Sequence, residues 1–181
     1  MMLRRYAMMA AQKVDLLEGY RVNKTATNNG YKLGVEWPTN DTVRFYHINS
    51  GFMGPNRAAI TFIGEKASYS TSAEAAMLKK EYALKTLEYG KQYKLTLTVL
   101  DVAKNTATTD NDGNFRVAIG GSGANASSST SINFSELVAG KQIEVVRLHS
   151  TGTPINCACF EATNSALLWD INFKVKFEEV K

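Results

Sequence analysis

Apolar and polar residues alternate along most of the chain, which is the period of a β-strand with one buried face. The final segment shows this best, because polar residues separate the apolar side chains one by one from Trp169 to Phe177. The segment 91–102 repeats the pattern, with one face made of Tyr93, Leu95, Leu97 and Val99. The alternation predicts an all-β protein whose strands each bury one face.

Turn signals divide these strands at short intervals. The phrase Leu-x-x-Gly-Lys-Gln occurs at 87–92 and again at 137–142, and its glycine permits a backbone conformation that other residues avoid. Asn28-Asn29-Gly30 predicts a hairpin between strands at Tyr20–Thr25 and Tyr31–Trp37. Other strands are expected at 43–48, 58–63 and 115–119. Short strands between such turns are typical of an antiparallel β-sandwich, here a jelly roll.

Two segments depart from this pattern. Residues 72–80 have a helix-forming composition and predict one short helix, followed by a strand over 84–89. Residues 1–19 are interpreted as a docking arm, helical or extended and buried only against a neighbour, and residues 20–181 as the sandwich domain. The residues expected to make the arm's contacts are Leu3, Arg4, Arg5, Tyr6, Val14 and Leu17.

The distribution of charge limits the classes of partner that the protein can bind. The net charge is +4, but residues 1–24 contain five basic and two acidic residues, which leaves 16 basic and 15 acidic residues for the remainder. A nearly neutral body does not suit a DNA-binding face, so no specific nucleic-acid partner is expected. No apolar run approaches the length of a membrane span, and the run after Arg5 is too short for a secretory signal. The chain is therefore expected to be made in a cytoplasm.

Three motifs suggest a metal or phosphate site, but each lacks residues or spacing that such a site requires. Cys157 and Cys159 are two residues apart on a predicted strand, which favours buried, reduced thiols over a disulfide or a metal site. The run Asp110–Asn114 lacks the spacing of an EF-hand, and Gly120–Thr130 lacks the Gly-Lys-Ser/Thr ending of a phosphate-binding loop. We therefore expect no metal and no cofactor.

No catalytic constellation is visible either. His47 and His149 have no partner that the sequence places beside them, and the chain has no Gly-x-Ser-x-Gly elbow. Both histidines are interpreted as polar strand residues, and no enzymatic activity is expected.

The candidate binding residues come from strand phase. Arg44 and Tyr46 alternate with Val43 and Phe45, so they predict an exposed aromatic–cation pair on the wet side of a strand. Arg116 and Arg147 extend this pair if all four residues converge on one concave surface. The alternative is an ordinary solvated sheet face.

Two resemblances suggest a function. The phrase Leu-x-x-Gly-Lys-x-Tyr-x-Leu at Leu87–Leu95, the strand Phe115–Ile119 and the closing aromatic strand resemble galactose-binding-like and carbohydrate-binding-module jelly rolls over residues 20–178. The opening Leu3–Ala10 resembles the first residues of virion structural proteins from phages of gut Bacteroidetes. Neither resemblance supplies catalytic residues.

Together they imply a non-enzymatic capsid-, head-fibre- or tail-associated protein located in the virion. Its partners would be other virion proteins or copies of itself. A carbohydrate-binding module of a bacterial glycan-processing or adhesion system, with glycans as ligands, is the alternative.

Overall fold

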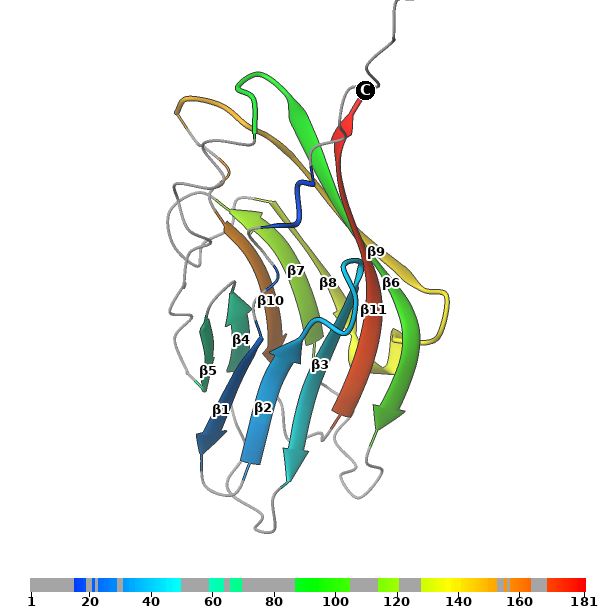
Figure 1. Ribbon diagram of the computed structural model, residues 1–181. Coiled ribbons are helices and arrows are strands. Elements are labelled where there is room, and N and C mark those ends of the chain that lie inside the picture. The colour runs from blue at the N-terminus through cyan, green and yellow to red at the C-terminus, as the bar shows by residue number, and fades with distance from the viewer. Residues whose placement is uncertain are drawn as a thin grey trace, which may run out of the picture.

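The structure is a computed structural model that describes residues 15–18, 21, 23–28, 31–49, 59–63, 66–69, 87–104, 114–120, 128–152, 155, 157–163 and 169–181. Its strands form two antiparallel sheets that face each other (Figure 1). The larger sheet contains β1 (Lys24–Asn28), β2 (Tyr31–Glu36), β3 (Thr42–Asn49), β11 (Trp169–Val180), β6 (Gln92–Lys104) and β9 (Gln142–Leu148), in that order. The smaller contains β5 (Lys66–Tyr69), β4 (Ala59–Ile63), β10 (Cys157–Thr163), β7 (Asn114–Gly120) and β8 (Ser128–Asn133).

The strand order is that of a jelly roll. When β3, β4 and β6 to β11 are numbered one to eight along the chain, one sheet has the order 1-8-3-6 and the other 2-7-4-5. The first strand therefore lies beside the last, and the chain crosses repeatedly between the sheets. Strands β1 and β2 extend the larger sheet beyond β3, and β5 extends the smaller one beyond β4. The predicted all-β antiparallel sandwich is confirmed.

The core lies between the sheets and is built from the predicted inward faces. Phe45 of β3, Phe115 of β7 and Phe173 of β11 meet at its centre, with ring centroids 5.1 to 5.9 Å apart. Leu95, Leu97 and Val99 of β6 are buried around them, as the alternation predicts. One irregularity interrupts β6, where Leu100 has no partner because the register with β11 shifts between Asn172 and Phe173.

The two copies of the turn phrase adopt matching structures at opposite ends of the β6–β9 pair. Gly90 has φ 82° and Gly140 has φ 85°, so both use the left-handed conformation that favours glycine. The Gly90 N–H donates to the His149 carbonyl, next to β9, and the Gly140 N–H donates to the Val99 carbonyl in β6. Each phrase thus both starts its own strand and binds the partner strand.

Some boundaries differ from the sequence-based expectation. The first strand is Lys24–Asn28 rather than Tyr20–Thr25, because its pairing with β2 continues to Asn28, whose register partner is Tyr31. The predicted helix at 72–80 lies outside the described residues. Of the strand expected over 84–89, the structure describes residues 87–89, and these belong to no strand because β6 begins only at Gln92.

Of the proposed arm residues, Leu3, Arg4, Arg5, Tyr6 and Val14 also lie outside the described part of the chain. The assignment of Leu17 to the arm is wrong, because Leu17 is buried in the core of its own chain. The adjacent Leu16 packs against that core. The sandwich domain therefore extends at least to these two leucines.

Candidate functional site

The four candidate binding residues do not converge. Arg44 and Tyr46 alternate with the core residues of β3, so they lie on the outer face of the larger sheet. Arg116 lies on the outer face of the smaller sheet, because Phe115 and Val117 of β7 point into the core. Arg147 is buried between the sheets and donates from Nη1 to the Ile119 carbonyl at 2.9 Å. The predicted concave surface is therefore wrong.

Arg44 is held by acidic neighbours within the same sheet. Its Nε and Nη2 donate to the two carboxylate oxygens of Asp170 at 2.8 and 2.6 Å, and its Nη1 donates to Glu36 at 3.1 Å. The register explains the pairing, because β3 lies between β2, which carries Glu36, and β11, which carries Asp170. The hydrogen bonds and charge of Asp170, followed by those of Glu36, raise the pKa of the Arg44 guanidinium.

Tyr46 is buried although it lies on the outer face. Its ring is only 2% exposed, and the Arg44 guanidinium lies over it, 4.8 Å from the centroid. Its hydroxyl donates to Glu36 at 3.2 Å and lies 3.1 Å from the Thr25 hydroxyl. The expected exposed aromatic–cation pair is instead an internal contact, so Tyr46 offers no face for a sugar ring to stack on.

A second polar cluster lies at the end of the sandwich where β9 finishes. His149 is fully buried, its Nδ1 accepts the Ile155 N–H at 2.8 Å, and Tyr89 stacks on its ring at 4.6 Å. Because Nδ1 is the acceptor, the neutral imidazole carries its proton on Nε2. Burial lowers the pKa of His149, and the charge of Arg147 lowers it further.

The phase of β9 contained the signal for this cluster. Arg147 and His149 follow Ile143 and Val145 at intervals of two, so all four point to the same side. From the sequence, Arg147 is expected at an exposed binding surface and His149 only as a polar strand residue, so the burial of both is a correction.

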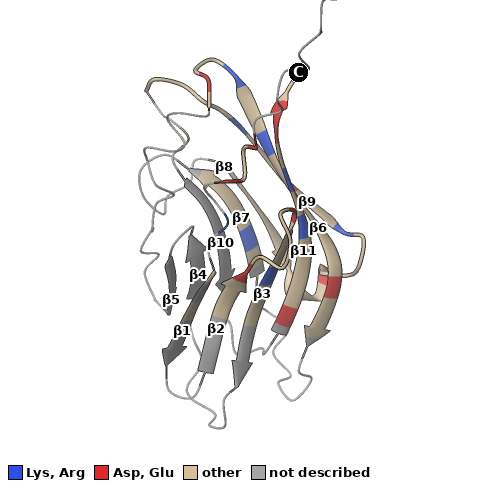
Figure 2. Cartoon of the chain, viewed as in Figure 1, with Lys and Arg blue, Asp and Glu red and all other residues tan. Residues whose placement is uncertain are grey.

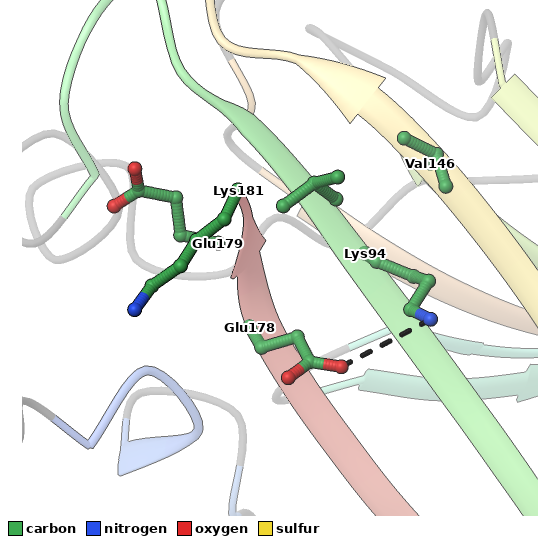
Figure 3. Close-up of a pocket in the computed structure, with 6 residues that line it drawn as sticks. Lys94, Val146, Glu178, Glu179 and Lys181 are labelled. Carbon is green, nitrogen blue, oxygen red and sulfur yellow. Dashed lines mark ion pairs between the residues drawn. The ribbon is translucent and has the colours of Figure 1, made fainter.

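Described residues on the outer face of the larger sheet line a depression of about 380 Å³ near the end of β11 (Figure 3). Lys94 of β6, Val146 of β9 and the C-terminal residues of β11 line it. Lys94 forms ion pairs with Glu144 at 3.3 Å and with Glu178 at 4.0 Å. The lining thus combines two valines with charged side chains of both signs.

Aliphatic side chains continue from this depression along β9. Val146 is 44% exposed and Leu148 is 47% exposed, and Val180 lies in the same row as Leu148 with Gln92 between them. Charges of both signs surround them on β6 and β11 (Figure 2). Such a mixture suits a protein interface better than a polyanion.

The structure describes the side chain of one of the two histidines. His149 is enclosed, and the side chain of His47 lies outside the part described, as do those of Cys157, Cys159 and Trp169. Within the described residues, no three His, Cys, Asp or Glu side chains are grouped so that they could hold a metal ion. In that same part of the chain, no helix is long and apolar enough to cross a membrane.

Comparison of the chain with models of known protein families found no match, and comparison with curated protein sequences found none.

Proposed function

We propose that this protein is a non-enzymatic structural component of a phage virion that assembles with other virion proteins or with copies of itself. The observation that supports this proposal is the row of exposed aliphatic residues on the outer face of the larger sheet, at Val146, Leu148 and Val180. Exposed aliphatic side chains that lie together mark surfaces that another molecule covers.

Two of the candidate binding residues, Arg44 and Tyr46, lie on the same face, and their contacts favour assembly over sugar binding at this face. Arg44 and Tyr46 already bond to Glu36, Asp170 and Thr25 within the chain. A ligand would have to break those bonds before it could use the two side chains. The jelly roll is compatible with this function, since viral capsid proteins and lectins both use it, but fold alone does not select between them.

Particle association tests the proposal directly. An antibody raised against the full chain should label phage particles in a lysate of infected cells, and the protein should sediment with purified particles. Absence from particles that contain the other structural proteins would contradict the proposal. A monomer that elutes alone and binds glycans would do so as well.

One observation favours carbohydrate binding as a second candidate. Tyr89 is 53% exposed while one face of its ring rests on His149, so the ring is a rigid, accessible plane of the kind that stacks on a sugar. If glycan binding is the function, Tyr89→Ala should abolish binding on a glycan array, and Tyr46→Phe should not. Glycan binding that survives Tyr89→Ala would exclude this site.

A further inference from the structure

Within the part of the chain that the structure describes, a stretch of backbone at the outer edge of β9 has no hydrogen-bond partner. The N–H and C=O of His149 bond to Lys91 and Gly90 on the β6 side. Because these groups alternate along an antiparallel strand, those of Val146 and Leu148 point to the opposite side, away from β6. No hydrogen bond joins them to the described residues.

Only part of this edge is open. The hydroxyl of Thr130, on β8, donates to the Glu144 carbonyl at 2.6 Å and covers the first half of β9. The second half contains no proline or glycine, and its one charged side chain, Arg147, points between the sheets. The usual devices that keep an edge strand from pairing are therefore missing at Val146 and Leu148.

The side chains of this stretch add a recognition surface to the open edge. Val146 lines the depression beside it (Figure 3), and Val180 lines it too. Glu144 and Glu179 stand around this surface, with side chains 47% and 38% exposed. A strand that pairs with β9 could place alternate aliphatic groups against Val146 and Leu148 and cations near these carboxylates.

We infer that residues 1–14 of a neighbouring copy of this chain add as a strand to the edge of β9 at Val146–Leu148. This inference rests on the proposed function, because it names the surface and the segment through which copies assemble.

The chemistry of the segment fits the edge. Residues 1–14 contain the cations Arg4, Arg5 and Lys13 and no carboxylate, and they include neither proline nor glycine. In an extended conformation Arg4, Tyr6 and Met8 share a face, which lets the last two cover Val146 and Leu148 while Arg4 approaches Glu144. Fourteen extended residues reach about 45 Å, enough to cross to an adjacent molecule.

Residues 1–14 join the described part of the chain in the same half of the sandwich as this surface. The first described segment, Asp15–Glu18, lies in the half of the sandwich in which β11 ends (Figure 1). Val180 and Lys181, which line the depression, lie at that end of β11.

The test uses the full chain and a pair of matched variants. Val146→Lys combined with Leu148→Lys adds charge to the edge, whereas Leu100→Lys adds it at an equally exposed aliphatic residue, 43% against 44% for Val146, on the bulge of β6. Sedimentation velocity over a range of concentrations should show self-association weakened by about tenfold or more in the edge variant and unchanged in the control. Circular dichroism checks that both variants keep the fold.

A synthetic peptide of residues 1–14 supplies an independent readout. It should compete with self-association of the full chain. Hydrogen exchange should show the Val146 and Leu148 amides protected at high concentration and exposed on dilution.

Three results would overturn the inference. The first is unchanged self-association of an edge variant that still folds. The second is that neither amide is protected in the assembled state. The third is protection that does not depend on concentration, which would mean that residues 1–14 pair with β9 of their own chain. Detection in virions separates these failures from failure of the proposed function. If the protein is found in virions but the edge variant associates as the wild type does, only the inference is contradicted. If the arm drives self-association but the protein is absent from virions, only the proposed function is contradicted.

Discussion

The phenol ring of Tyr46 lies directly over Gly34 on the neighbouring strand. The two residues are register partners in β3 and β2, and a Cβ added to Gly34 would overlap the ring. The missing side chain lets the ring lie flat against the sheet, where its hydroxyl reaches Thr25 and Glu36. A tyrosine on the outer face is buried in this way by its own sheet.

Gly34→Ala should therefore lower the free energy of unfolding by about 1–3 kcal/mol, because the methyl group displaces the ring and its hydrogen bonds. In the background of Tyr46→Ala the same substitution should cost much less. Urea denaturation of the two single variants and the double variant measures the coupling. Additive effects would show that the ring and the glycine are independent.

The two turn glycines should be equally sensitive. Gly90→Ala and Gly140→Ala each place a side chain at positive φ, and both positions have open space around the added methyl group. Each substitution should therefore lower the free energy of unfolding by about 1–2 kcal/mol through backbone strain alone. Gly152 also has open space and its φ lies outside the left-handed region, so Gly152→Ala should be neutral or slightly stabilising. Thermal denaturation compares the three. A cost at Gly152 as large as at the turns would exclude the strain explanation.

Asp170→Asn should destabilise the protein by about 1 kcal/mol, because it weakens a two-pronged, partly screened ion pair with Arg44. The Arg44 and Asp170 side chains are 35% and 29% exposed, which limits the effect. The matched control is Lys174→Met, which removes a single contact of 3.6 Å to Asp41 between two well-exposed side chains. Chemical denaturation should show no measurable change for the control. Equal losses for both variants would mean that the Arg44 network contributes no more than a surface pair.

Stability should fall as the pH drops through the range in which histidine titrates. Burial lowers the pKa of His149 in the folded protein, so below about pH 6.5 the unfolded chain binds the extra proton and the folded chain resists it. The contribution is complete above that pH and is lost on acidification. Unfolding free energies at several pH values should show this slope in the wild type and in His47→Gln, and a flatter one in His149→Gln. A slope that follows His47 instead would contradict the assignment.

Cys157 and Cys159 should behave as structural thiols. They occupy β10, between β4 and β7, where their backbones pair with Gly120 and Ala118 of β7. A chelator and a reductant should leave the unfolding midpoint unchanged, and replacement of both cysteines by alanine should cause only a modest packing loss. Unfolding on metal removal, with a stoichiometric metal in the purified protein, would refute this prediction.

The sequence was sufficient for the features that depend on near neighbours along the chain. Alternation in β6 and β11 identified their buried faces, because side chains in a strand point to opposite sides in turn. The repeated phrase marked two turns whose glycines do adopt positive φ. The jelly-roll class was also correctly predicted from the spacing of strands and turns.

Only the tertiary structure decided which strands lie together and what they bring into contact. Strand pairing joins residues far apart in the chain, such as Arg44 and Asp170, and local patterns carry no information on that choice. Tyr46 could be recognised as buried only once β2 was known to place Gly34 beneath it. The four candidate residues shared a chemistry in the sequence, but the crossing of the chain between sheets put them on two outer faces and in the interior.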